Sequence, residues 1–255
     1  MDKENIRQFA YDCGADAVGF ASLEDYKSER SPDPKKIMKN AASLIVLGYR
    51  ELDGSVESRN VRISMTARMG GIGTSLKDSY LVARYIEDTY KVKAAPIPYG
   101  APLDMGENSM GFIGDISLRH AAVAAGLGVF GRHNLVINPQ YGTRIIFSAV
   151  LTELPIASDP PDGARYCENC DRCIKACPAE ALEVEGKTDV MKCLTVSQPY
   201  GIGDMIRYTK KFIGTSPEEQ KSLLRDPIFL HLYQASFIGF QYCCFRCMMV
   251  CPAGE

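Results

Sequence analysis

Cys167-x2-Cys170-x2-Cys173-x3-Cys177-Pro178 is the stretch of sequence that decides the fold of this chain. A second run, Cys244-x2-Cys247-x3-Cys251-Pro252, repeats its last three cysteines, and Gln241 stands where the first would fall. This spacing wraps three thiolates around one [4Fe–4S] cluster and sends the fourth thiolate to a neighbouring cluster. The two runs therefore predict two [4Fe–4S] clusters held by one small domain.

Counting thiolates shows how the two clusters would share their ligands. Two clusters need eight thiolates, and the crossed rule assigns seven of them. The eighth is Cys193 or Cys243; we expect Cys193, because adjacent cysteines such as Cys243 and Cys244 point in different directions. The predicted ligands are Cys167, Cys170, Cys173 and Cys251 for the first cluster site, and Cys177, Cys193, Cys244 and Cys247 for the second cluster site.

Structural zinc and disulfides are the alternative explanations of these cysteines. Zinc sites usually pair two short Cys-x2-4-Cys clips across a longer loop, and disulfides need an oxidising compartment. Residues 1–5 are charged and show neither an apolar signal core nor a twin-arginine pair. No apolar run reaches about 18 residues. We therefore expect a cytoplasmic protein without a membrane partner.

The composition is that of an ordinary globular chain, with 255 residues, 46% of them hydrophobic, and a net charge of −2. No basic stripe of the kind found in nucleic-acid binders is present. Residues 154–162 contain three prolines, which places a domain boundary there and predicts domains at 1–158 and 159–255. A helical insert at about 203–240 separates the cysteine runs, with an N-capping signal at Ser216.

Apolar periodicity predicts an α/β fold for the first domain. A helix is expected over residues 2–13, followed by buried strands at 17–21 and 44–49. A further helix is expected over 74–90. The glycine-rich residues 70–73 before it could form an anion-binding loop or, more simply, a flexible turn.

A second glycine-rich stretch, residues 126–131, is formally Gly-x-Gly-x-x-Gly. The dinucleotide fingerprint needs a strand before the glycines and a helix after them. Here a long loop at 99–114 and an alanine-rich helix at 115–125 precede, and a strand at 134–138 follows. We therefore reject a Rossmann site and expect the strand 134–138 to form a hairpin with a strand at 144–151.

The glycine stretch and the cysteines together resemble the epoxyqueuosine reductase family and, more loosely, the corrinoid-dependent reductive dehalogenases. The segments that carry the resemblance are Ala125-Gly126-Leu127-Gly128-Val129-Phe130-Gly131-Arg132-His133-Asn134, Asn138-Pro139-Gln140-Tyr141-Gly142, Leu151-Thr152-Glu153-Leu154-Pro155, Gly14-Ala15-Asp16-Ala17-Val18-Gly19-Phe20-Ala21 and both cysteine runs. The resemblance implies a nitroreductase-like domain that binds base-off cobalamin, followed by a ferredoxin-like domain with two [4Fe–4S] clusters. It also implies an oxidoreductase that passes electrons from an external donor, such as a ferredoxin or flavodoxin, through the clusters to cobalt.

Three departures from that family affect the expected substrate. Phe112 stands where the family has its proton-donating aspartate, and Val129 stands where the family commonly has tryptophan. The printed sequence ends at Glu255, before the helical-repeat region that helps the family hold tRNA. We therefore expect a short paralogue that acts on a small molecule or on a partner protein's corrinoid, and we do not expect tRNA as a partner.

The expected corrinoid site lies at the glycine stretch and the residues after it. Its residues are Gly126, Gly128, Gly131, Arg132, His133 and Asn134, and the candidate proton donors are Asp115, Tyr99 and His133. Two alternatives remain open. The chain could be an electron-transfer protein that delivers electrons to a partner, or it could bind flavin in place of a corrinoid.

Overall fold

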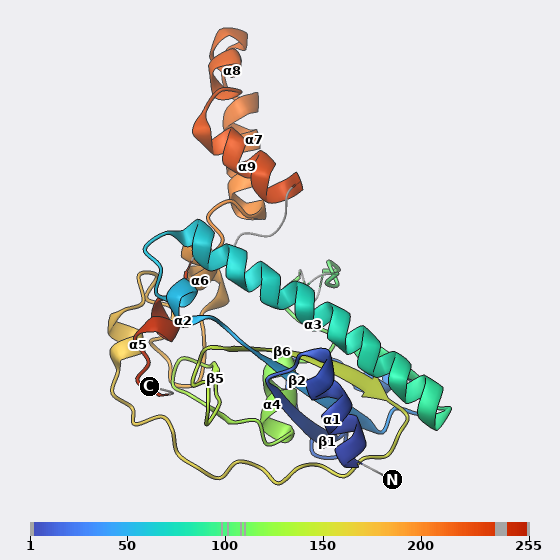
Figure 1. Ribbon diagram of the computed structural model, residues 1–255. Coiled ribbons are helices and arrows are strands. Elements are labelled where there is room, and N and C mark those ends of the chain that lie inside the picture. The colour runs from blue at the N-terminus through green and yellow to red at the C-terminus, as the bar shows by residue number, and fades with distance from the viewer. Residues whose placement is uncertain are drawn as a thin grey trace.

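The computed structural model describes residues 3–97, 99–100, 102–107, 109, 111–237 and 244–253 (Figure 1). Its N-terminal part is built on a four-stranded sheet with the order β1 (Ala17–Ser22), β2 (Ser43–Arg50), β6 (Ile145–Thr152) and β3 (Ala94–Ile97). All neighbouring strands are antiparallel. The central strands β2 and β6 are buried along almost their whole length, as continuous apolar runs predict.

Helices cover both faces of this sheet. On one face, α1 (Lys3–Cys13) and α3 (Val61–Tyr90) pack on β2 and β6 through a core that includes Ile6, Ile45 and Val82. On the other face, α4 (Leu118–Ala124) packs through Ala121 on side chains such as Leu44. Side chains of a strand alternate between its faces, so the two cores share the same strands. The result is a helix–sheet–helix sandwich, in agreement with the α/β prediction.

The first elements follow their sequence signals. Helix α1 and strands β1 and β2 lie where periodicity predicts them. Gly14 follows α1 with a φ of +128°, a conformation that glycine adopts without steric cost. These three predictions are confirmed.

Helix α3 contradicts the expectation of a glycine-rich loop at residues 70–73. The helix has 30 residues and begins at the N-cap Asn60, whose side chain accepts a hydrogen bond from the Arg62 amide. The hydroxyl of Ser75 bonds back to the Ile72 carbonyl at 2.8 Å, inside the helix. The anion-binding loop and the flexible turn are therefore both wrong. Glycine costs about 1 kcal/mol in a helix, and packing of the long helix on the sheet offsets that cost.

The predicted hairpin between residues 134–138 and 144–151 is also wrong. Strand β5 (Val136–Ile137) pairs with β4 (Val129–Phe130) in a separate two-stranded sheet, whereas β6 pairs with β2 and β3. The glycine stretch 126–131 therefore leads through a small hairpin, and the rejection of a Rossmann turn is confirmed. Side-chain alternation alone does not reveal which strands pair.

The segment after β6 runs along the edge of β1. Asp159 accepts a hydrogen bond from the Phe20 amide at 3.0 Å, and its own amide donates to the Phe20 carbonyl at 2.9 Å. Asp159 also forms ion pairs with Arg7 and Lys3. This segment covers an edge strand that would otherwise be open to pairing.

The cysteine-rich part contains short helices and a projecting helical insert (Figure 1). Its elements are α5 (Arg172–Lys175), α6 (Val190–Ser197) and α10 (Arg246–Met249), with α7 (Ile202–Ile213), α8 (Pro217–Leu223) and α9 (Pro227–Phe237) forming the insert. The capping box of Ser216 and Glu219 is present, as predicted. The remaining elements are the 3₁₀ turn η1 (Pro34–Lys36) and α2 (Asp53–Val56). None of the helices in the described residues has the length and apolar character needed to cross a membrane.

Candidate functional site

The four cysteines of the first cluster site surround one cavity. Cys167, Cys170, Cys173 and Cys251 line it, together with Arg132, His133 and Asp171 among others. Burial raises the pKa of the Cys173 thiol, and the nearby Cys251 and Cys167 add to the rise. Cys170 is exposed. A cysteine near the C-terminus thus joins three from the first run, which is the juxtaposition that crossed ligation requires.

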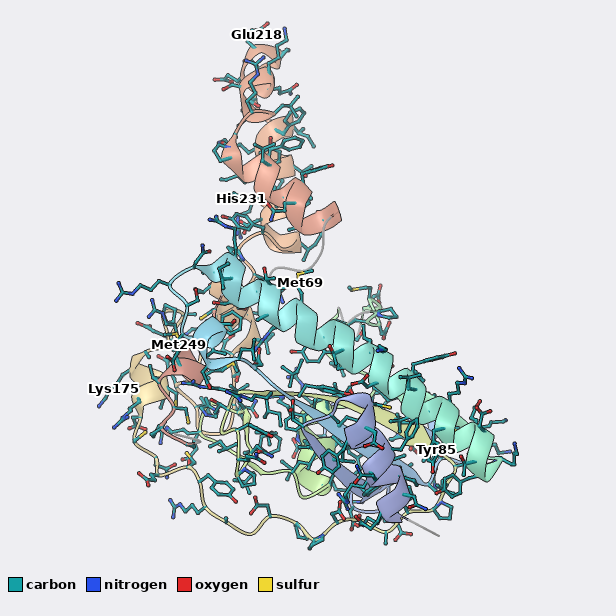
Figure 2. All side chains as sticks on the ribbon, in the orientation of Figure 1. Met69, Tyr85, Lys175, Glu218, His231 and Met249 are labelled. Atoms are coloured by element: carbon teal, nitrogen blue, oxygen red, sulfur yellow. The ribbon has the colours of Figure 1, made fainter. Side chains whose placement is uncertain are left out.

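The loops between these cysteines turn tightly. Asn169 and Asp171 have φ values of +54° and +58°, in the left-handed region that Asn and Asp tolerate better than most residues. The chain therefore curls around the cavity within two short Cys-x2-Cys steps. Behind it, α5 packs against α10, and Figure 2 marks these two helices by Lys175 and Met249.

The four cysteines of the second cluster site also lie near one another. Burial raises the pKa of Cys247 to about 12, and Cys244, Cys193 and Cys177 contribute further in that order. Burial likewise raises the pKa of Cys193, on α6, with Cys244 and Cys177 adding to it. Cys193 thus lies beside the thiols it was predicted to join, although no observation tests its ligation. Gln241 and Cys243 lie outside the described residues.

As they stand, the described side chains form no group of three or more His, Cys, Asp or Glu that could hold a metal ion. Among the described cysteines Cys170 is exposed and the others are half-buried or buried. Ligand assignment at both sites therefore stays a prediction.

A cavity of about 420 Å³ lies between the second cluster site and the sheet. Its walls come from the loop that follows β3 (Tyr99, Gly100, Pro102, Leu103, Gly111, Phe112, Gly114, Asp115), from the start of α4, from β5 and β6, and from Arg68, Gln198 and Met248. Met248 follows Cys247 in the chain. Gln198 follows Ser197, whose hydroxyl oxygen accepts a hydrogen bond from the Cys193 thiol at 3.7 Å. The cavity and the second cluster site therefore share a wall.

Arg68 holds this shared wall in place. Its Nε and Nη2 donate to the two carboxylate oxygens of Glu51 at 2.7 and 2.6 Å, and both side chains are buried. Nη2 also contacts the Met248 sulfur at 3.3 Å, and the guanidinium lies 4.6 Å from the centre of the Phe245 ring. A bidentate pair of this kind fixes geometry as well as charge. The sequence offered no signal for Arg68, because its helix was not predicted to extend that far.

A larger cavity of about 950 Å³ adjoins the 420 Å³ cavity and shares Phe112, Gly114, Ser117 and Arg119 with it. Lys27, Arg30 and Lys187 also line it, with Glu29 as its acidic residue. Burial lowers the pKa of Arg119, and the neighbouring Arg30 lowers it further. Within the described part of the chain no carboxylate forms an ion pair with Arg119. This cavity is therefore suited to an anionic group.

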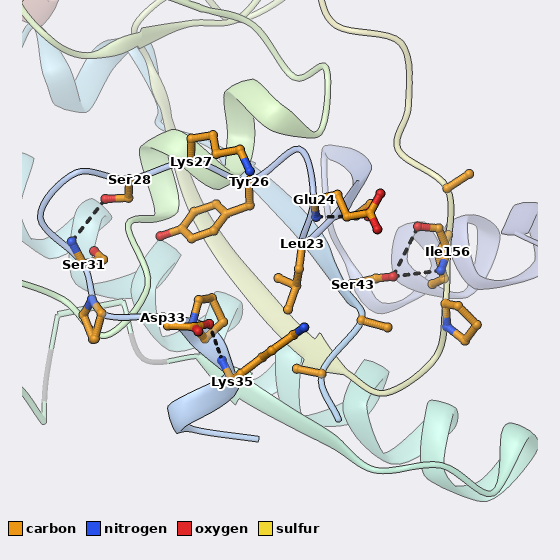
Figure 3. Close-up of a pocket in the computed structure, with 17 residues that line it drawn as sticks. Leu23, Glu24, Tyr26, Lys27, Ser28, Ser31, Asp33, Lys35, Ser43 and Ile156 are labelled. Atoms are coloured by element: carbon orange, nitrogen blue, oxygen red, sulfur yellow. Dashed lines mark hydrogen bonds between the residues drawn. The ribbon is translucent and has the colours of Figure 1, made fainter. Parts of the chain in front are cut away.

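A third pocket, of about 840 Å³, continues from this cavity past Lys27, Ser28 and Ser31. Figure 3 shows Tyr26 and Leu23 at its wall, with Ser43 hydrogen-bonded to Ile156 on the far side. No cysteine lines it. Among the described residues, the 950 and 420 Å³ cavities have no cysteine in their walls either; the 420 Å³ cavity approaches the thiols through Met248, the neighbour of Cys247.

The three glycines of the predicted corrinoid site pack against the protein itself. A Cβ on Gly126 would lie 2.4 Å from the Pro160 carbonyl oxygen, and one on Gly128 would lie 2.2 Å from that of Ile137. A Cβ on Gly131 would lie 2.6 Å from the His133 ring. None of the three lines the 420 or the 950 Å³ cavity. Close backbone approach accounts for these glycines without a ligand.

The other predicted binding residues are divided between two places. Asn134 lines the larger cavity, and its carbonyl accepts a hydrogen bond from Arg119. Arg132 and His133 instead line the first cluster site. The Arg132 amide donates to the Cys167 sulfur at 3.4 Å, and its side chain pairs with Asp171 at 3.1 Å.

The candidate proton donors are divided between the 420 Å³ cavity and the first cluster site. Tyr99 and Asp115 both line the 420 Å³ cavity. Burial raises the pKa of Tyr99, with Arg68 acting in the opposite direction. His133 does not line this cavity, and burial lowers its pKa to about 4. The structure thus brings Tyr99 and Asp115 together and sets His133 apart.

Comparison with known proteins bears on this arrangement. No protein-family model matches the chain. The chain is 24% identical to the epoxyqueuosine reductase of Listeria monocytogenes over 279 residues, covering 98% of this chain and 64% of that enzyme. It is 31% identical to the Staphylococcus aureus epoxyqueuosine reductase over 234 residues, covering 81% of this chain and 59% of the relative.

The chain is a homologue of the epoxyqueuosine reductases. It spans about 64% of the length of the first of these relatives. The fold agrees, since an epoxyqueuosine reductase crystallised with an epoxyqueuosine-modified tRNA stem loop superposes with a TM-score of 0.62 at 18% identity, covering 99% of this chain and 65% of that one. A catabolic reductive dehalogenase superposes with a TM-score of 0.60 at 20% identity, covering 76% of this chain and 29% of that one. The expected resemblance to the epoxyqueuosine reductases and, more loosely, to the reductive dehalogenases is thereby confirmed.

Proposed function

We propose that this epoxyqueuosine reductase homologue is an iron–sulfur oxidoreductase that binds a corrinoid in the two adjoining cavities and reduces a small substrate there. The observation that carries the proposal is the wall that the 420 Å³ cavity shares with the second cluster site, through Met248 beside Cys247. A cluster at that site would lie next to anything bound in the cavity.

Two observations support the fit of the proposed cofactors. Four thiols line one cavity and four others lie near one another, which matches in number the eight thiolates that two [4Fe–4S] clusters need. The adjoining cavities, of about 950 and 420 Å³, reach the upper end of the usual range for ligand pockets. When bound, a corrinoid would supply a metal centre that can reach a low oxidation state, and the protein would bind, orient and tune it.

The order of the sites supports a direction for electron transfer. Cys170 of the first cluster site is exposed, so an external donor such as a ferredoxin or flavodoxin would dock on that side. The pKa of Cys247 is raised by Cys173 of the first site as well as by the thiols of its own group, so the two sites are neighbours. The second site adjoins the cavity. Electrons would therefore enter at the surface and leave toward the cavity.

The residues of the cavities divide into binding and proton-transfer roles. Arg119 and Arg30 would hold an anionic part of the ligand. Tyr99 and Asp115 line the cavity nearer the second cluster site and are positioned to supply a proton to a substrate. Phe112, in the family's aspartate position, lines both cavities and carries no acidic proton. Asp115 is therefore the better candidate for that task.

The substrate is proposed to be a small molecule or a partner protein's corrinoid. A relative has been solved with a tRNA stem loop, so tRNA stays open as a partner of this chain and needs a direct test. Binding of an epoxyqueuosine-modified stem loop should be measured at several salt concentrations. An affinity that falls steeply with salt would make tRNA a partner, because phosphate contacts make affinity strongly salt-dependent.

The first test is anaerobic titration of the cluster-reconstituted chain with cob(II)alamin, followed by electron paramagnetic resonance. We expect stoichiometric binding with a base-off spectrum and about eight irons per chain, the number that two [4Fe–4S] clusters contain. Arg119→Met should weaken binding about tenfold or more, since hydrogen bonds to charged groups contribute about 1.5–3 kcal/mol. The matched control is Lys210→Met on the projecting insert.

The same preparation tests the two other functions. Released flavin after denaturation would favour a flavoprotein. Two intact clusters, rapid reversible reduction and no affinity for cob(II)alamin would favour an electron carrier and overturn the corrinoid proposal.

A further inference from the structure

His133 is buried, and one of its ring nitrogens has no hydrogen-bond partner in the described part of the chain. The side chain is 3% exposed. Its Nδ1 accepts a hydrogen bond from the Leu135 amide at 3.1 Å, whereas its Nε2 has no partner among the described residues. Leaving a buried polar atom unpaired costs about 1–3 kcal/mol, so such an atom points to a missing group.

The hydrogen bond to Leu135 determines which nitrogen carries the proton. An amide N–H can donate to Nδ1 only when that nitrogen presents a lone pair. The proton of the ring therefore lies on Nε2. The unpaired atom is thus a hydrogen-bond donor and needs an acceptor.

Once an iron–sulfur cluster occupies it, the cavity that His133 lines contains such acceptors. The ring shares this cavity with Cys167, Cys170, Cys173 and Cys251. The adjacent Arg132 amide already donates to the Cys167 sulfur at 3.4 Å. Gly131 leaves room for the ring, since a Cβ there would lie 2.6 Å from His133 Cε1 and 3.1 Å from Nε2. The loop after β4 therefore turns two N–H donors toward the first cluster site.

We propose that His133 Nε2–H donates a hydrogen bond to a sulfur of the iron–sulfur cluster at the first cluster site and thereby raises its reduction potential. Hydrogen bonds to cluster sulfurs are one of the levers that set the potential, because they stabilise the more negative, reduced state. This inference rests on the proposed function, which supplies the cluster. It gives His133 a tuning role in place of the proton-donor and corrinoid-binding roles expected from sequence.

Two substitutions separate the donor from the rest of the side chain. His133→Asn keeps a side-chain oxygen near the position of Nδ1, where it can accept from Leu135, but has no N–H near the position of Nε2. His133→Gln places an amide N–H near the position of Nε2. In redox titrations of the reconstituted full chain, we expect His133→Asn to lower the midpoint potential of the first cluster and His133→Gln to stay close to the unsubstituted protein. The second cluster should keep its potential in both.

A pulsed magnetic resonance measurement on the unsubstituted protein gives a first readout that does not depend on a variant folding. With ¹⁵N-labelled histidine in the unsubstituted protein, the reduced first cluster should show a nitrogen coupling and an exchangeable proton coupling, both lost in His133→Asn. The control is His231→Asn; His231 stacks on Tyr200 with ring centres 4.4 Å apart, on the projecting insert. This control should leave both the couplings and the potentials unchanged.

The outcomes distinguish failure of the inference from failure of the proposed function. If the unsubstituted chain does not load iron, the proposed function fails. If it loads both clusters but shows no histidine coupling, or if both His133 variants shift the potential equally, the hydrogen bond proposed here does not exist.

Discussion

At the scale of single residues, the buried ion pair of Arg68 and Glu51 is the feature on which the proposed site depends most. It joins α3, the end of β2 and the Cys244–Cys247 segment through the contacts of Arg68 with Glu51, Met248 and Phe245. Removing one partner of a buried pair leaves the other charge uncompensated, whereas removing both is far less costly.

Arg68→Met should therefore destabilise the reduced apoprotein by about 3–5 kcal/mol. Chemical denaturation under anaerobic, reducing conditions measures the change in the free energy of unfolding. The double variant Arg68→Met/Glu51→Gln should regain part of the loss. A double variant no more stable than the single one would contradict the explanation by uncompensated charge.

Gly128 is a second residue whose role can be tested directly. Its φ is +146°, and a Cβ would lie 2.2 Å from the Ile137 carbonyl oxygen. Gly128→Ala should lower the free energy of unfolding by about 1–3 kcal/mol, because it overpacks the contact between the glycine stretch and β5. Gly163→Ala is the matched control, since no atom lies within 4 Å of a Cβ there. Equal effects of the two substitutions would disprove the packing role.

At the scale of elements, the segment that carries Asp159 joins the first domain to the cysteine-rich part by covering the edge of β1. Leu154 and Ile156 are buried in the core of the first domain, so the segment belongs structurally to that domain. Asp159 provides the polar half of this attachment through Phe20, Arg7 and Lys3.

Asp159→Ala should expose this edge. The variant should lose about 1–3 kcal/mol of stability, because the half-buried charges of Arg7 and Lys3 lose their partner. Amide hydrogen exchange should rise at Phe20, whose N–H donates to Asp159, while exchange in β6 stays slow. Unchanged protection at Phe20 would show that the segment does not hold the edge.

At the scale of the whole molecule, the crossed arrangement of thiols ties the two ends of the cysteine-rich part together. Cys251 joins the first run, and Cys177 and Cys193 join the second. Each predicted cluster site thus combines thiols from segments that are far apart in the sequence, with the projecting insert between them.

Cys193→Ser should remove or weaken the second cluster and spare the first. We expect the iron content to fall by about half, with affinity for an electron donor retained and reduction of a bound corrinoid lost. Cys13→Ser is the control, because this half-buried thiol belongs to neither group. Full iron content in Cys193→Ser would transfer the eighth ligand to another residue, with Cys243 as the first to test.

The sequence by itself determined the parts of this protein that depend on local spacing. Thiolate spacing predicts both cluster sites, and apolar periodicity predicts α1, β1 and β2, because each of these patterns lies within a few neighbouring residues. Only the tertiary structure decided the rest. It extended α3 through residues 70–73, paired β6 with β2 instead of β5, and placed His133 at the first cluster site and Arg68 beside the second. These outcomes depend on packing between segments distant in the chain, which no local pattern records.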